Sequence, residues 1–177
     1  GRDTSTTSAL GFIEELDNVM KETELGTIAT ICGRYYAMDR DNKWDRTKVY
    51  TDLLFKGKAA KLRSYSAGIK ECYKRDITDE FLPPILLNEK GLIKDGDGIF
   101  WLNFRGDRAR QILTVLKDEE FAEYKVNVPQ VEVLTLVDVP NTKNCITLIP
   151  EQEEIYSLGC YLSDLGLRQA RIAETEK

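Results

Sequence analysis

The sequence contains no histidine. Histidine changes charge near neutral pH and is a frequent metal ligand, so it takes part in many active sites. Its absence excludes a histidine-based catalytic triad and a histidine-ligated metal centre built from this chain alone. Catalysis by these residues would have to use carboxylates, arginines, lysines or groups supplied from elsewhere.

Cysteine is sparse, and its four positions are far apart in the sequence. They are Cys32, Cys72, Cys145 and Cys160. No Cys-x-x-Cys pair occurs, and there is no histidine to complete a zinc site. We therefore expect four buried, reduced thiols in preference to a disulfide or a metal site, and no metal ligands in this chain.

Long hydrophobic runs are also absent. No apolar stretch approaches the roughly 20 residues that a membrane helix needs, and the charged and hydroxyl residues at the N-terminus are unlike a signal peptide. We expect a cytoplasmic protein without a membrane partner. The net charge of −5 disfavours nucleic acid as a partner, since nucleic-acid binding needs a basic surface. Any anion site must therefore be local.

Helix-like and strand-like segments alternate along the chain, which indicates an α/β fold. The expected helices cover residues 10–25, 45–56, 66–75, 107–117 and 156–165. The expected strands cover residues 27–32, 99–104, 131–137, 145–149 and 169–173. The run over 99–104 is continuously apolar, which predicts a central strand. We expect a three-layer α/β/α domain with a mixed sheet that is incomplete at its N-terminal side, followed by a helix and strand of a second domain.

Arginine and aspartate occur together in three places where an apolar run gives way to a helix or loop. The pairs are Arg2-Asp3, Arg34 and Arg40 within residues 33–41, and Arg105 and Arg108 within residues 103–110. Guanidinium groups bind carboxylate or phosphate through two parallel N–H donors. Because ligands of open α/β sheets bind beyond the carboxyl ends of the strands, the three places together predict a pocket for a small, multiply charged anion.

Each of these motifs also has a structural interpretation. Arg34 and Arg40 could form ion pairs with aspartates at positions 39, 41 and 45. Arg105 and Arg108 could simply be solvated at a helix end, and Arg2-Asp3 could be a frayed terminus. Arg46 and Arg110 are interpreted as surface or ion-pair residues, and the aromatic residues Tyr35, Tyr36, Trp44 and Trp101 as core residues.

Five segments in the same order resemble the cofactor-independent, or 2,3-bisphosphoglycerate-independent, phosphoglycerate mutases. They are residues 1–4 with 8–11, residues 33–41 with 44–46, residues 77–81, residues 103–111 and residues 167–177. The resemblance implies an isomerase that interconverts 3-phosphoglycerate and 2-phosphoglycerate in glycolysis, through a phosphoserine enzyme. One departure is Gly106, where the family usually has proline.

The resemblance also implies a domain organisation. Residues 1–149 would be part of the phosphotransferase domain, residues 150–154 an interdomain linker, and residues 155–177 the first helix and strand of the returning phosphatase domain. The chain would be about a third of the enzyme. The serine nucleophile and the two Mn ions (or Mg, Co or Zn) would belong to the rest of it, so the isolated chain should be inactive. No 2,3-bisphosphoglycerate would be needed, and the complete enzyme would be a monomer.

Residue roles follow from the same resemblance. Arg2, Arg34, Arg40 and Arg108 would surround the glycerate, and Asp3 would move a proton on or off its hydroxyl. Arg105 and Lys177 would neutralise the phosphoryl group during transfer. Asp3 and Lys177 are thus the expected catalytic residues. The alternative is a non-catalytic anion-binding or interaction module of the same fold.

Overall fold

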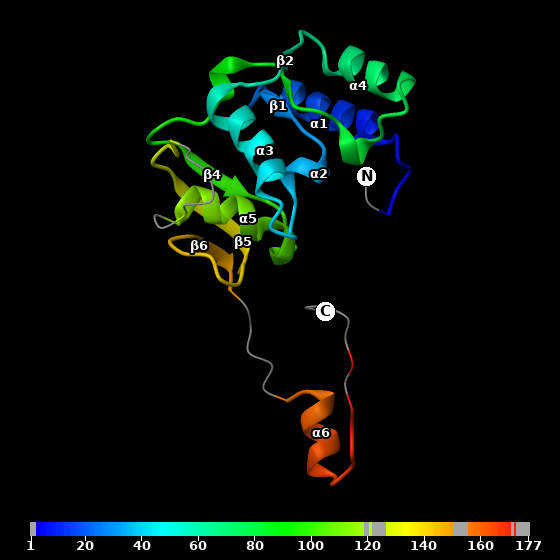
Figure 1. Cartoon of the computed structure of the whole chain (residues 1–177), viewed down its shortest axis with the longest axis vertical. Coiled ribbons are helices and arrows are strands. Elements are labelled where there is room, and N and C mark those ends of the chain that lie inside the picture. The colour runs from blue at the N-terminus through cyan, green and yellow to red at the C-terminus, as the bar shows by residue number, and fades with distance from the viewer. Residues whose placement is uncertain (1–2, 119–120, 122–126, 151–155, 171, 173–177) are drawn as a thin grey trace.

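The computed structural model describes residues 3–118, 121, 127–150, 156–170 and 172. Within them the strands form two small three-stranded sheets, which lie one above the other in Figure 1 with helices around them. The expected α/β class is confirmed. One of the two sheets is mixed, and the other is parallel.

The first sheet is mixed, and each of its strands is only two residues long. Its order is β1 (Thr30–Ile31), β3 (Ile85–Leu86) and β2 (Ala60–Lys61). Strand β3 runs antiparallel to β1 and parallel to β2. Beside this sheet lie helices α1 (Ala9–Thr23) and α4 (Tyr65–Lys74). Their shared core contains buried Ile69 and Leu82.

The second sheet is parallel throughout, in the order β4 (Gly98–Trp101), β5 (Glu132–Val137) and β6 (Ile146–Ile149). Helix α5 (Gly106–Lys117) packs on it through fully buried residues such as Leu113, which meets Val133 of β5 in one core. Strand β4 is at the edge, so the prediction of a central strand over 99–104 was wrong. The apolar run reflects an exposed face of the sheet: Phe100 and Ile146 are both exposed.

Two further helices lie between β1 and β2 in the chain. Helix α2 (Arg34–Ala37) follows β1, and helix α3 (Trp44–Lys56) follows α2. The carbonyl of Leu54 in α3 accepts a hydrogen bond of 3.0 Å from the Ile93 N–H. Short 3-10 helices occur at η1 (Asp79–Phe81) and η2 (Glu89–Gly91).

The last described helix, α6 (Leu158–Asp164), lies apart from the two sheets in Figure 1. Residues 169, 170 and 172 are not in a strand, so a strand over 169–173 is not present at its described positions. Most of the expected linker and the last residues of the chain lie outside the described part. Among the described helices, none combines the length and the hydrophobicity required to cross a membrane.

All four cysteines are described, and none forms a disulfide, but the prediction that all are buried was wrong. Cys72 is buried, Cys32 and Cys145 are partly buried, and Cys160 is exposed on α6. Burial raises the pKa of the Cys32 thiol to about 12. That thiol stays protonated at neutral pH and is a poor nucleophile.

Candidate anion-binding site

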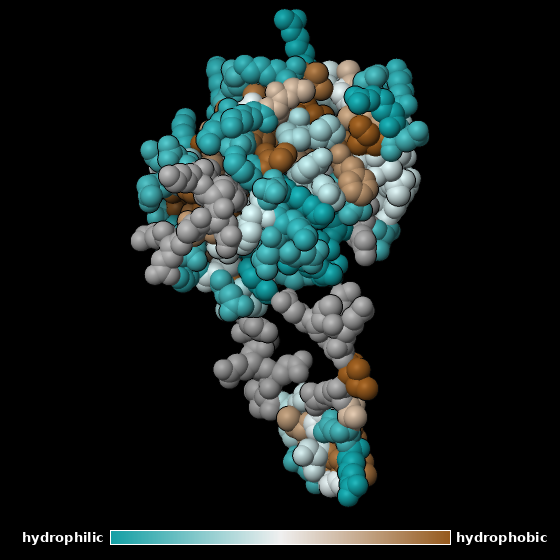
Figure 2. Space-filling view, viewed as in Figure 1, coloured by the Kyte–Doolittle hydropathy of each residue, from teal (hydrophilic) through white to brown (hydrophobic). Residues whose placement is uncertain are grey.

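A cavity of about 480 Å³ lies where α1, β1 and the start of α2 approach the start of α5. Its charged lining residues are Asp3, Arg34, Asp79, Arg105 and Arg108. We call it the arginine cavity. The volume is within the range of small-molecule sites. Figure 2 shows hydrophilic residues gathered over the region where the segment after α2 meets the start of α5.

Arg34 is positioned by the glycine that precedes it. The Gly33 N–H donates a hydrogen bond of 2.8 Å to the Leu82 carbonyl. A Cβ added at Gly33 would lie 2.4 Å from the Glu80 carbonyl oxygen, so the backbone of η1 fits directly against this position. Helix α2 then begins at Arg34. These backbone contacts therefore fix the position of the Arg34 backbone.

Arg108 approaches the same cavity from the side of the second sheet, because it belongs to the first turn of α5, which packs on that sheet. Its Nη1 donates a hydrogen bond of 2.9 Å to the Met38 carbonyl. Burial and the positive charges of Arg34 and Arg40 lower the pKa of the Arg108 guanidinium. Several like charges are thus held close together, and a bound anion would relieve their repulsion.

Arg40 is linked to this cluster through Asp107, with Nη1 and Oδ2 2.6 Å apart. Burial alone would raise the pKa of the Asp107 carboxyl, but the hydrogen bond from Arg40 and the charges of Arg105, Arg40 and Arg108 outweigh burial and lower that pKa. The carboxylate therefore stays ionised beside the arginines. Arg40 does not line the cavity itself, but its partner Asp107 lies 4.0 Å from the guanidinium of the lining residue Arg105.

The alternative interpretation paired Arg34 and Arg40 with the aspartates at positions 39, 41 and 45, but the ion pair that the structure gives for Arg40 is with Asp107. Asp39 is 4% exposed, pairs with Arg46 at 3.2 Å and accepts backbone hydrogen bonds from Asp41 and Lys43. Arg46 also lies over the Tyr35 ring, 4.0 Å from its centroid. Arg46 is thus an ion-pair residue, as expected, and Asp39 shapes the loop that precedes α3.

Asp3 lines the arginine cavity in a left-handed backbone conformation, with φ of 61°. Aspartate adopts this region more readily than most residues. The structure therefore brings together four of the expected site residues: Asp3, Arg34, Arg105 and Arg108. Three other residues were expected to contact the ligand. Arg40 lies outside the cavity lining, and Arg2 and Lys177 lie outside the described residues.

Asp79 is the site residue to which the sequence analysis gave no role. Its carboxylate accepts hydrogen bonds from the Ser8 and Ala9 N–H groups, each 2.9 Å long, and from the Tyr73 hydroxyl at 2.5 Å. Burial alone would raise the pKa of Asp79, but these hydrogen bonds outweigh it and lower that pKa. Its segment, residues 77–81, was part of the resemblance, but Ser8 and Ala9 lie 71 and 70 positions away, so these two contacts leave no local signal in the sequence.

Among the described residues, no group of three or more cysteine, aspartate or glutamate side chains is placed to hold a metal ion. What the cavity offers is positive charge from two directions with a carboxylate at Asp3. Such an arrangement can bind an anion, stabilise charge that develops on it and exchange a proton with a bound hydroxyl group.

Several known proteins are similar to this chain. It is 41% identical over 182 residues to the 2,3-bisphosphoglycerate-independent phosphoglycerate mutase of Clostridium perfringens, in a match that covers 100% of the chain and 36% of the relative. The enzyme of the same name from Onchocerca volvulus is 40% identical over 182 residues, with 100% and 35% covered. The chain therefore spans about a third of the length of these relatives.

A solved structure agrees with the sequence relatives. It is a crystal structure of Leishmania mexicana phosphoglycerate mutase at low cobalt concentration, with a TM-score of 0.79 and 27% sequence identity. The match covers 94% of this chain and 33% of the other. A family model described as BPG-independent PGAM N-terminus matches residues 1–140. The chain belongs to this BPG-independent PGAM N-terminus family.

Proposed function

We propose that the chain is the part of a glycolytic phosphoglycerate mutase that holds the glycerate while 3-phosphoglycerate and 2-phosphoglycerate are interconverted. The observation that carries the proposal is that three arginines line one cavity. Arg34 comes from the helix after β1, whereas Arg105 and Arg108 come from the start of the helix after β4. The relatives named as such mutases support the identity of the substrate.

The side chains of the cavity have distinct roles in this proposal. Arg34 and Arg108, with Arg40 and Arg2, bind the glycerate and its carboxylate, because bidentate guanidinium contacts fix the orientation of a carboxylate. Arg105 and Lys177 offset the charge that spreads over the phosphoryl oxygens during transfer.

Asp3 carries the proton of the reaction. The phosphoryl group passes from the glycerate oxygen to the deprotonated oxygen of a serine elsewhere in the enzyme, and Asp3 supplies the proton that the departing glycerate oxygen takes up. In the return step, Asp3 accepts the proton of the other hydroxyl as that oxygen takes the phosphoryl group. The arginines retain the glycerate between the two steps, which avoids the entropic cost of a second encounter.

The domain assignment belongs to the same proposal. Residues 1–149 form part of the phosphotransferase domain, residues 150–154 the linker, and residues 155–177 the start of the returning phosphatase domain. The serine and two divalent metal ions, Mn or alternatively Mg, Co or Zn, belong to the remaining phosphatase domain, which is the partner of this segment. The complete enzyme would be a cytoplasmic monomer that does not need 2,3-bisphosphoglycerate.

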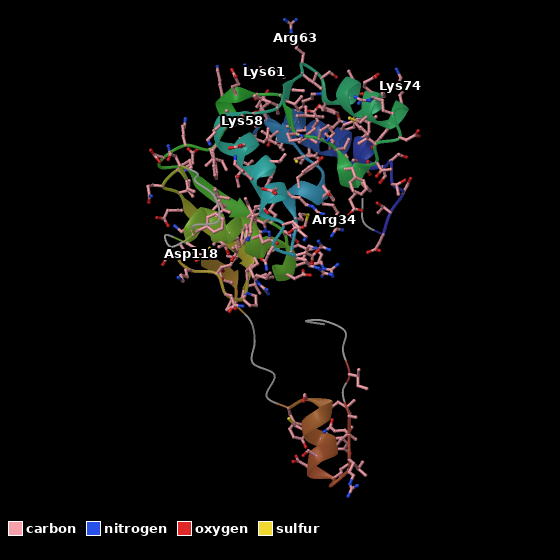
Figure 3. The ribbon with its side chains drawn as sticks, viewed as in Figure 1. Arg34, Lys58, Lys61, Arg63, Lys74 and Asp118 are labelled. Carbon is pink, nitrogen blue, oxygen red and sulfur yellow. The ribbon has the colours of Figure 1, made fainter. Side chains whose placement is uncertain are left out.

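The test compares two arginines in a full-length mutase that carries this segment. Arg108→Ala should lower kcat/KM at least 100-fold, because a partly buried charge that contacts the ligand in this proposal is lost. Arg63→Ala is the control: Arg63 is exposed, and Figure 3 shows it far from Arg34, at the upper end of the view. Equal activities in the two variants would contradict the proposal.

The purified 177-residue chain provides the second measurement. It should show no mutase turnover, even with divalent metal present, because the serine nucleophile is not in it. Turnover by this chain alone would refute the assignment of the nucleophile. Binding of 3-phosphoglycerate by the chain, combined with a full-length protein that lacks mutase activity, would favour an anion-binding module instead.

A further inference from the structure

The 3-10 helix η1 and the residue that follows it contact two parts of the arginine cavity. Through its Asp79 side chain it holds the segment that leads from Asp3 into α1. Through the backbone at Glu80 and Leu82 it fits against Gly33, which precedes Arg34. One short element thus fixes the distance between a carboxylate and an arginine of the site.

The contacts of Asp79 with the N-terminal segment are numerous for one side chain. Besides the Ser8 and Ala9 N–H groups, its carboxylate lies 3.4 Å from the Ser8 hydroxyl, and its own N–H donates to the Thr6 carbonyl at 2.8 Å. Ser8 in turn donates to the Ser5 carbonyl at 2.7 Å. The whole turn between Asp3 and α1 is therefore tied to residue 79.

Helix α1 depends on this contact because it has no cap of its own. Ser8 occupies the N-cap position, but its side chain makes no capping hydrogen bond to the helix. The Asp79 carboxylate binds the free N–H groups in its place, where negative charge is also favoured by the helix dipole. Asp79 is only 4% exposed, so water does not readily replace it.

We propose that Asp79 is a positioning residue of the mutase site: it holds the turn from Asp3 to α1 so that the Asp3 carboxylate faces the arginines of the cavity. The inference rests on the proposed function, because it concerns the proton step assigned to Asp3. Asp79 acts through Asp3 and does not itself exchange the proton. Its carboxylate is already committed to two backbone N–H groups and to Tyr73.

The decisive experiment is a double-mutant cycle in a full-length mutase that carries this segment, with Asp79→Asn, Asp3→Asn and the double variant. We expect Asp79→Asn to lower kcat at least 10-fold and to change KM less than threefold, because the arginines remain in place. In the Asp3→Asn background the same change should lower kcat less than twofold, since its target is already gone. Equal losses in both backgrounds would overturn the inference.

Two further variants separate positioning from loss of folding. Asp17→Asn removes a carboxylate that belongs to α1 itself. Asp17 accepts a hydrogen bond of 2.9 Å from Tyr65 and lies outside the cavity lining. It should leave kcat within twofold of the parent enzyme. Tyr73→Phe removes one of the bonds to Asp79 and keeps the helix cap, so it should lower kcat by less than Asp79→Asn does. A Tyr73→Phe loss equal to or larger than that of Asp79→Asn would contradict the inference.

The outcomes also separate the inference from the function on which it rests. If Asp3→Asn keeps full activity, the proton role of Asp3 is wrong and the proposed function fails at that residue. If Asp3→Asn loses activity but Asp79→Asn does not, the function stands and the positioning role of Asp79 is refuted.

Discussion

The two sides of the arginine cavity are built differently. On the side of the first sheet, Gly33 fits against backbone atoms of η1, and Asp79 binds backbone N–H groups of α1. On the side of the second sheet, the links are side-chain contacts: Arg40 with Asp107, and Arg108 with the Met38 carbonyl. We call these the backbone-fitted side and the ion-paired side. Backbone contact tolerates little change, whereas ion pairs between partly exposed side chains can be exchanged for contacts with a ligand.

The largest expected effect is on the backbone-fitted side. Gly33→Ala should destabilise the chain by about 3 kcal/mol, because the added Cβ would meet the Glu80 oxygen at 2.4 Å and the Leu82 nitrogen at 2.6 Å, and neither is the end of a flexible side chain. The measurement is urea unfolding of the 177-residue chain, followed by circular dichroism.

The matched control is Gly11→Ala in the interior of α1. An added Cβ there has no heavy atom within 4 Å, so the variant should gain roughly 0.5–1 kcal/mol from the better helix propensity of alanine. Equal effects of the two substitutions would show that the fit at Gly33 has no energetic importance.

The second effect concerns Arg108 on the ion-paired side and should be large for ligand binding and small for stability. Arg108→Met removes a partly buried cation whose pKa is lowered by burial and by Arg34 and Arg40, so we expect the chain to keep its stability within about 1 kcal/mol. Millimolar 3-phosphoglycerate should raise the Tm of the parent chain and of Arg63→Ala, but not of Arg108→Met. A ligand-induced rise in all three would argue against the cavity as the binding site.

The third effect depends on pH and concerns Asp107. Its folded-state pKa is lowered, so its contribution to stability is present above the unfolded value, near pH 4, and is lost as the pH falls through the folded value. Asp107→Asn should therefore cost up to about 1 kcal/mol at pH 7. The cost should shrink between about pH 5 and pH 2. A difference that is constant over this range would exclude the ionised pair with Arg40.

The smallest effect is expected far from both sides. Lys61 and Glu89 are 2.5 Å apart, but their side chains are 67% and 62% exposed. Lys61→Met should leave the urea midpoint unchanged, since water and salt screen such a pair. A clear shift of the urea midpoint would mean that exposed ion pairs contribute more to the stability of this chain than we expect from the comparison of the two sides.

The helices were largely predictable from the sequence, and the strands were less so. Helical periodicity places α3 and α5 within one residue of their observed bounds, because each has one face turned towards a core. The strand expected over residues 27–32 shrinks to Thr30–Ile31, since only that pair forms hydrogen bonds with β3. The apolar run after residue 98 suggested burial on both faces, but in this chain one face of the sheet is exposed.

The site was predictable in its residue types and not in its connections. Arginine motifs at element junctions indicated an anion pocket, and the family resemblance separated the arginines into roles. The pairing of Arg40 with Asp107 and the cap that Asp79 provides for α1 join residues more than 60 positions apart. Neither contact has a spacing that a helix or strand period could reveal, so only the three-dimensional structure shows them.

The cap of α1 has a consequence for the timing of synthesis. Helix α1 is made before the carboxylate that binds its N–H groups, which belongs to residue 79 and follows 70 residues later. At roughly 5–20 residues per second, the ribosome needs about 4–14 s to add that stretch. Throughout this interval the nascent helix lacks its cap, and the turn that carries Asp3 has no partner to fix it. The order of synthesis and the order of assembly therefore differ: Asp3 is made before residue 79 but reaches its final place only after it.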